Sequence, residues 1–125
     1  MKFFQQKTFH NPSWSPDQQW IVFGRAVKSS GENWGSGIWH IFKVRRDGSG
    51  LVDLSLTGGH ADRAEYKPSF SPDGKYIVFG SIHEAKNPRE SHNAIFKMDT
   101  NGGSLKRLTN PPYTGMFPVW LPSGN

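Results

Sequence analysis

One short motif occurs three times in this 125-residue chain and limits the folds that the chain can adopt. The copies occupy residues 12–24, 68–80 and 118–125, and the third copy is incomplete. The second copy runs from Pro through an aromatic residue into Ser-Pro-Asp-Gly and then into an apolar run. Pro presets φ, Asp can accept hydrogen bonds from backbone N–H groups, and Gly tolerates positive φ. The motif therefore predicts two strands joined by a tight turn.

The other two copies depart from this pattern at single positions. The first copy has Gln18 where the second has Gly74. A side chain in the left-handed conformation expected there costs about 1 kcal/mol. The third copy, Leu121-Pro122-Ser123-Gly124, keeps Pro and Gly but loses Asp.

Further strands follow the motif at matching offsets. Residues 38–44 and 93–99 each read as a strand, and Ile95 follows Ile41 by 54 residues. Residues 51–57 alternate in polarity as a half-buried strand does, and residues 105–109 occupy the corresponding place in the next unit. Four polar or Gly-rich segments are expected to be loops: residues 25–37, 58–67, 82–92 and 110–117. Each unit then has four short strands, which is the organisation of a β-propeller blade.

We therefore expect an all-β fold of four-stranded antiparallel β-propeller blades, two per chain. Residues 1–125 would form one propeller segment. It comprises a lead-in strand at 2–9, blade one at 11–57, blade two at 66–109 and a partial blade strand at 116–121. Propellers have about 4–8 blades, so these blades need others, either from the rest of a larger propeller or from further copies of the chain. A cyclic homo-oligomer would close the ring, and a trimer of six blades is favoured over a tetramer.

Residues 68–79, 95–103 and 107–109 together resemble the WD40-like repeats of TolB-type β-propellers. The first copy matches at residues 12–23 and more loosely at residues 41–48. The resemblance covers nearly the whole chain and implies a propeller blade. It does not imply one activity, because similar blades serve as scaffolds, partner platforms and substrate gates.

Composition and charge exclude several classes of protein. The chain has no cysteine, which excludes disulfides and thiolate metal sites, and its formal charge is +5. The densest basic group, Lys43, Arg45 and Arg46, reads as a solvated strand end, so nucleic acid is not an expected partner. No signal-like or membrane-spanning apolar run is present, so we expect a cytoplasmic protein with no membrane partner. A signal removed by processing would leave the same sequence.

Candidate ligand-binding residues lie on the expected loops. In a propeller, the loops between second and third strands and those between blades share one face, and loops held on a rigid scaffold often bind ligands. Trp34 and Tyr113 could stack on a sugar ring or on a partner's side chain. The candidates are Arg25, Trp34, His60, Asp62, Arg63, His83, Glu84, Arg89, His92 and Tyr113.

Two kinds of chemistry find little support. His60 with Asp62, and His83 with Glu84 and His92, could converge at a ring axis, but their spacing matches no compact metal motif. No metal or other cofactor is therefore expected. The chain also lacks a Gly-x-Ser-x-Gly elbow and a cysteine nucleophile, so no catalytic residue is assigned.

The expected function is that of a non-enzymatic binding module or scaffold, whose loop-bearing face engages a protein, peptide or carbohydrate. The alternative is a propeller-type lyase or hydrolase module, with a loop-built site at the ring axis that works with or without a metal. Resemblance supplies this alternative, because oligogalacturonate lyases use metal-bound His on similar blades, although none of their residues maps onto this chain. A third reading is a purely structural ring.

Overall fold

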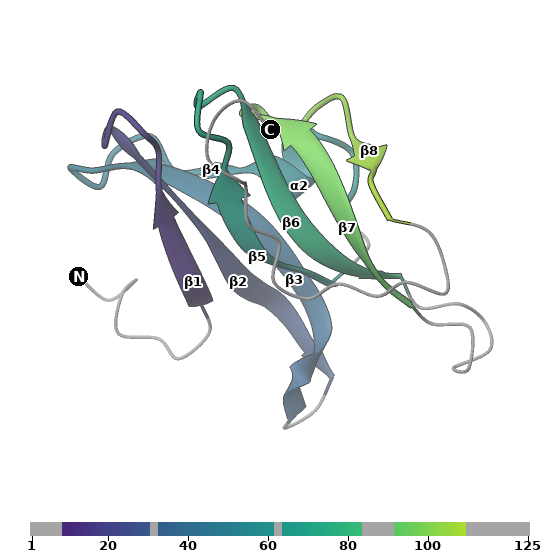
Figure 1. Ribbon diagram of the computed structural model, residues 1–125. Coiled ribbons are helices and arrows are strands. Elements are labelled where there is room, and N and C mark those ends of the chain that lie inside the picture. The colour runs from purple at the N-terminus through teal and green to yellow at the C-terminus, as the bar shows by residue number, and fades with distance from the viewer. Residues whose placement is uncertain (1–8, 31–32, 62–63, 84–91, 110–125) are drawn as a thin grey trace.

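Eight strands and a one-turn helix make up the described part of the chain, which is residues 9–30, 33–61, 64–83 and 92–109 of the computed structural model (Figure 1). The first four strands are β1 (Phe9–Trp14), β2 (Trp20–Ser30), β3 (Asn33–Arg45) and β4 (Val52–Asp53). The helix α2 (Leu54–Thr57) follows them. The second four strands are β5 (Ala64–Phe70), β6 (Tyr76–His83), β7 (His92–Asp99) and β8 (Lys106–Arg107). No helix in these ranges has the length and apolarity needed to cross a membrane.

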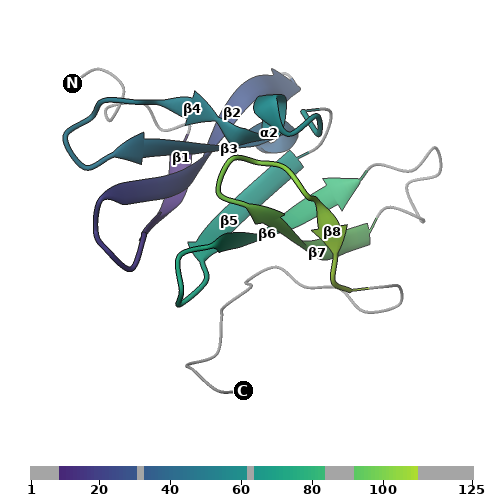
Figure 2. The same ribbon diagram turned by 90° about the horizontal axis from the view of Figure 1, so that it is seen from above.

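Each group of four strands pairs antiparallel in chain order. We call β1–β4 blade one and β5–β8 blade two. One parallel pair between β3 and β5, Trp39 opposite Ala64, joins the two into a single sheet. Figure 2 shows the blades side by side, with α2 lying beside blade two. The prediction of an all-β fold built from four-stranded antiparallel units is confirmed.

The two Ser-Pro-Asp turns have the same geometry. In each, the Ser hydroxyl donates to the Asp carboxylate at 2.6 Å, from Ser15 to Asp17 and from Ser71 to Asp73. The same carboxylate oxygen accepts a backbone N–H two residues further on, at 3.0 Å. The Ser hydroxyl bond, then the backbone N–H bond, lowers the pKa of both carboxyls. The prediction that Asp organises this turn is confirmed.

Gln18 adopts the strained conformation that the sequence predicts. Its φ is +60°, and φ is +74° at Gly74, the corresponding residue of the second turn. Lys67 and Asn11 also have positive φ, at +55° and +57°, each directly before the Pro that opens its motif. Register shifts in β1 and β5 occur at the same places, so each motif begins with a β-bulge.

The prediction of a loop at residues 25–37 is wrong for most of that range. β2 continues to Ser30 and β3 begins at Asn33, with Arg25 opposite His40 and Ala26 opposite Trp39. A hairpin ladder needs only backbone hydrogen bonds, so polar and Gly-rich residues can extend it. The expected loops at 58–67 and 82–92 are likewise shortened by β5, which begins at Ala64, and by β6, which ends at His83.

Residues 51–57 were expected to form one strand, and this prediction is also wrong. Only Val52 and Asp53 pair with β3. Asp53 then caps α2, because its carboxylate accepts the N–H of Leu56 at 3.0 Å. Leu54 is fully buried and Leu56 is 64% exposed. The alternation of apolar and polar residues that predicted a strand therefore occurs here in one helical turn.

The hydrophobic core spans both blades. Val22, Ile41 and Leu54 of blade one pack with residues of blade two in a single cluster. The blade-two members are Phe70, Ile77, Phe79, Ala94, Phe96 and Met98. A smaller cluster of Phe23, Phe42 and Val44 lies on the other side of blade one. The aromatic rings that recur between units stack within each blade, Phe23 on Phe42 and Phe79 on Phe96.

One tight contact between the blades is made by backbone atoms without side chains. Gly102, in the turn between β7 and β8, has φ +90°, and a Cβ added there would lie 2.2 Å from the Leu54 carbonyl oxygen of α2. A Cβ added at Gly58, just after α2, would lie 1.9 Å from the Gly102 carbonyl oxygen. Only glycine therefore fits at either position.

Replacing Gln18 with Gly should stabilise the chain by about 1 kcal/mol, because it relieves a side chain in the left-handed region. The reverse change, Gly74→Gln, should destabilise it by a similar amount. Urea unfolding of both variants measures these differences. Equal stabilities of Gln18→Gly and the parent chain would show that the turn at residues 15–20 carries no strain.

Gly102→Ala should cost substantially more than Gly48→Ala. Both glycines have φ +90°, but nothing lies within 4 Å of a Cβ added at Gly48. Gly48→Ala therefore reports backbone strain alone, about 1–2 kcal/mol. The Gly102 variant must also push α2 away, for a total of about 3–5 kcal/mol. Equal losses in chemical denaturation would contradict the tight blade contact.

Candidate functional site

The blades have two ends with different character. The turn face carries the turns at residues 15–19, 46–51, 71–75 and 100–105, which lie at the top of Figure 1. The loop face is the opposite end, where β2 ends at Ser30 and β6 ends at His83. The candidate residues were expected on the loop face.

The structure places five of the ten candidate residues in described segments. Arg25 lies on β2 with its guanidinium 5.7 Å from the centre of the Phe42 ring, and Trp34 lies near the start of β3. His83 and His92 are opposite each other at the end of the β6–β7 hairpin. Five candidates lie outside the described residues and stay predictions: Asp62, Arg63, Glu84, Arg89 and Tyr113.

His60 is not presented to solvent but belongs to a buried network between the blades. Its side chain is 2% exposed, its Nδ1 lies 2.9 Å from both oxygens of Glu65, and its Nε2 lies 2.9 Å from the Gly102 carbonyl oxygen. The Ser55 hydroxyl donates to Glu65 at 2.5 Å and accepts the Ile41 N–H at 2.8 Å. A ligand could reach the His60 nitrogens only by breaking these bonds.

A second imidazole has the same arrangement. His40 Nδ1 lies 2.5 Å from an Asp53 carboxylate oxygen, and Nε2 lies 2.9 Å from the Ala61 carbonyl oxygen. Each of these two histidines thus connects a carboxylate to a backbone carbonyl. His40 orders the segment that crosses from blade one to blade two.

Ser55, His60 and Glu65 are the residue types of a hydrolase triad, but their order is wrong for nucleophilic catalysis. A triad needs the serine hydroxyl bonded to the imidazole, which takes its proton. Here the Ser55 hydroxyl bonds to Glu65, and Nε2 of the His60 imidazole bonds to the Gly102 carbonyl oxygen. Ser55, His60 and Glu65 therefore form a structural contact between the two blades. Among the residues that the structure describes, no group of three or more His, Cys, Asp or Glu side chains could hold a metal ion.

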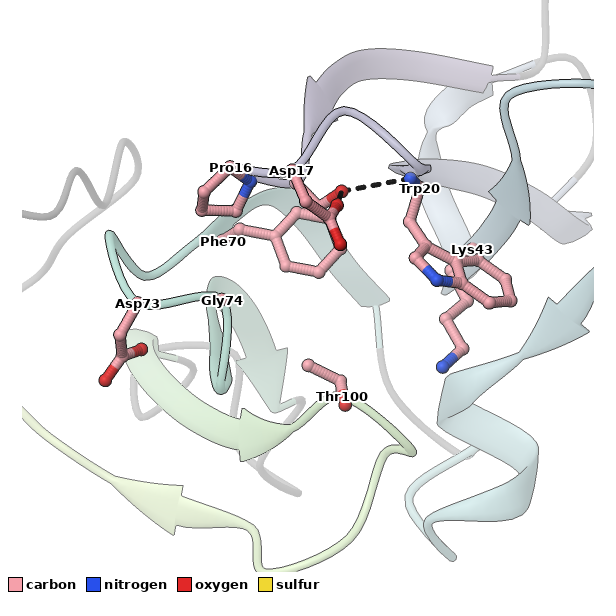
Figure 3. Close-up of a pocket in the computed structure, with 9 residues that line it drawn as sticks. Pro16, Asp17, Trp20, Lys43, Phe70, Asp73, Gly74 and Thr100 are labelled. Atoms are coloured by element: carbon pink, nitrogen blue, oxygen red, sulfur yellow. Dashed lines mark hydrogen bonds between the residues drawn. The ribbon is translucent and has the colours of Figure 1, made fainter.

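The turn face has a groove where the blades meet (Figure 3). Its cavity has a volume of about 270 Å³. The two Ser-Pro-Asp turns form its walls, and Pro16 of one lies 3.5 Å from a Cβ added at Gly74 of the other. The described residues that line it are Ser15, Pro16, Asp17, Trp20, Lys43, Phe70, Asp73, Gly74 and Thr100.

Lys43 is the buried cation of this groove. The residue is 9% exposed, and its ammonium lies 4.5 Å from the centre of the Trp20 ring and 3.4 Å from Asn101 Oδ1. Burial, and then the charge of Arg45, lowers the pKa of Lys43, while Asp99 opposes this shift. Reading Lys43 as part of a solvated strand end was therefore wrong, whereas Arg45 and Arg46 are exposed.

The sequence contained a signal for this groove. Lys43 and Lys97 recur 54 residues apart, and Trp20 and Tyr76 recur 56 apart. Lys97 lies 4.4 Å from the centre of the Tyr76 ring, as Lys43 lies over Trp20. A lysine repeated with an aromatic partner indicates a fixed contact. The groove itself was not predictable, because it depends on how the two blades pack.

The comparisons with known proteins cover most of the chain but only part of its relatives. No protein-family model matches. An uncharacterised peptidase of Bacillus subtilis, YuxL, is 27% identical over 115 residues, which is 91% of this chain and 16% of the relative. An uncharacterised protein of Agrobacterium fabrum is 32% identical over 74 residues, which is 59% of this chain and 22% of the relative. The chain thus spans less than a quarter of the length of either protein.

Two solved structures have the same arrangement of strands. A protein described as TolB from Agrobacterium tumefaciens superposes with a TM-score of 0.70 at 23% identity, covering 95% of this chain and 37% of that one. TolB from Acinetobacter baumannii gives a TM-score of 0.52 at 24% identity, covering 86% of this chain and 22% of that one. These likenesses show that the chain shares the β-propeller fold of the two TolB structures.

Proposed function

We propose that the chain is a non-enzymatic scaffold and binding module: a pair of blades that packs against further blades of the same kind. One observation carries the proposal. The internal joint is the set of residues through which blade one contacts blade two. Similar residues recur at the turn-face edges of the two outer blade faces, which we call the outer rims.

The internal joint has three contacts near the turn face. Lys43 of blade one bonds to Asn101 of blade two. Phe70 is 8% exposed because it packs in the shared core. Gly102 meets the backbone of α2.

The outer rim of blade two repeats the blade-one half of this joint. Lys97 takes the place of Lys43 and lies over Tyr76 as Lys43 lies over Trp20. The Ile95 N–H donates to the Thr109 hydroxyl at 2.9 Å, as the Ile41 N–H donates to Ser55. The outer rim of blade two therefore has the residues for a contact like the one that blade one makes with blade two.

The outer rim of blade one repeats the blade-two half. Trp14 takes the place of Phe70 but is 51% exposed. Gly48 takes the place of Gly102, with the same φ of +90° and open space around it. Asp47 takes the place of Asn101. A head-to-tail contact between two copies would therefore bring Lys97 of one copy against Asp47 of the other. These two residues have opposite charges and would replace the Lys43–Asn101 hydrogen bond of the internal joint.

Such a contact is heterologous, and when the rotation closes it gives a cyclic assembly. A trimer of six blades is the ring that we favour. The relatives are longer than this chain, and in a longer polypeptide the same rims would meet that polypeptide's own blades. The loop face would remain open to a protein, peptide or carbohydrate ligand.

We expect a carbodiimide to join Lys97 of one copy to Asp47 of another, because it forms an amide only between an ammonium and a carboxylate in contact. A mixture of ¹⁵N-labelled and unlabelled chains separates cross-links between copies from those within one copy by mass spectrometry. Lys75→Met, which removes an exposed turn lysine, should leave the yield unchanged. A monomer at every concentration, with no mixed-isotope product, refutes the association.

Charge reversal provides the second arm of this test. Lys97→Asp or Asp47→Lys alone should weaken self-association at least about tenfold, because each places like charges across the contact. The double variant should recover part of the loss. Light scattering gives the mass of the assembly. Single variants that associate like the parent chain would exclude this pair from the contact.

The competing proposal is a propeller-type lyase or hydrolase module, and the similarity to the peptidase YuxL favours it. The wrong order of Ser55, Glu65 and His60 argues against hydrolysis by these residues. We expect the purified 125-residue chain to cleave neither casein nor a fluorogenic peptide library. Cleavage that copurifies with the chain and survives Ser55→Ala would replace the scaffold proposal with an enzyme whose site lies elsewhere.

A further inference from the structure

The ammonium of Lys43 has fewer hydrogen-bond acceptors than it can use. It can donate three hydrogen bonds, and the structure gives it one long bond to Asn101. No carboxylate among the described residues forms an ion pair with the Lys43 ammonium. Buried charges are normally paired, so a lysine that is 9% exposed and lines a cavity has capacity for an acceptor that enters from outside.

The neighbouring carboxylates are occupied elsewhere. Asp99 accepts the N–H groups of Asn101 and Gly103, at 2.8 and 3.0 Å. Asp17 accepts the Ser15 hydroxyl and a backbone N–H within its own turn. In Figure 3 the Asp73 carboxylate points away from the cavity, whereas the Lys43 ammonium points into it towards Thr100.

The shape of the groove limits the size of the acceptor. A cavity of about 270 Å³ is suited to one side chain or chain end. Trp20, Phe70 and Pro16 supply apolar walls for methylene groups, and Lys43 and Thr100 supply polar contacts.

We infer that this groove binds the carboxylate of a peptide, either an acidic side chain or a C-terminus, with Lys43 as its cation. A single negative charge suits the site, because the residues that line the groove include one buried ammonium and the two carboxylates of Asp17 and Asp73. A polyanion such as nucleic acid would meet those two carboxylates. The site lies within one chain, so it does not depend on the association proposed above.

Three matched peptides test the inference and separate the two sources of carboxylate. The first is acetyl-Gly-Gly-Glu-Gly-Gly-amide, the second has Gln in place of Glu, and the third has that Gln and a free C-terminus. The probe signal is the indole N–H resonance of Trp20, assigned with Trp20→Phe. The inference predicts a saturable shift with one or both acids and none with the neutral peptide. An equal shift with all three, or none with any, overturns it.

Lys43→Met keeps the apolar stem over Trp20 and removes the charge. It should weaken binding of the acidic peptide at least about tenfold, whereas Lys75→Met should bind like the parent chain. Unchanged binding by the Lys43 variant would place the carboxylate elsewhere.

A measurement on the unaltered chain keeps the inference testable if the Lys43 variant fails to fold. Burial lowers the pKa of Lys43, and a bound carboxylate should raise it, because the charged form gains a partner. Binding should therefore be lost as pH rises through the pKa of the complex. NMR titration of Lys43 with and without saturating acidic peptide measures the shift. An unchanged pKa contradicts the inference.

Discussion

The buried carboxylate of Glu65 holds the two blades in one arrangement. It lies on β5 of blade two and is fully buried, yet its partners, Ser55 and His60, come from the end of blade one and the crossover. His60 then extends the network to the Gly102 carbonyl in the far turn of blade two. An unpaired buried charge is strongly destabilising, so the blades cannot slide past each other without breaking this set. The hydrophobic core supplies attraction between the blades, and Glu65 fixes their position.

The same joint explains why α2 replaces the end of an outer strand. Asp53 caps the helix with one carboxylate oxygen and contacts His40 with the other. The turn of helix then buries Leu54 and Ser55 against blade two. A continued strand would have placed alternate residues on opposite faces of the sheet, so Leu54 and Ser55 could not both have been buried there. Contacts between the blades therefore decided the local structure of this segment.

The sequence predicted those features that depend on residues close together in the chain. The conformation of Gln18, the bonds of Asp17 and Asp73, and the strands on either side of the turns depend on short-range geometry, and all were found. The hairpin beyond Arg25 was missed because backbone pairing tolerates polar residues. α2, the burial of His60 and the burial of Lys43 were missed for a different reason. Each depends on a residue of the other blade, and spacing along the chain carries no such information.

The single parallel rung between Trp39 and Ala64 has a mechanical consequence. The central strands of a blade pair over many rungs, with eight between β6 and β7, but a single backbone rung pairs the described strands of one blade with those of the other. The angle between blades is therefore set by the side chains and turns of the joint and not by a continuous backbone lattice. Changing a few joint residues should therefore alter the angle between the two blades while leaving the strand ladders within each blade intact.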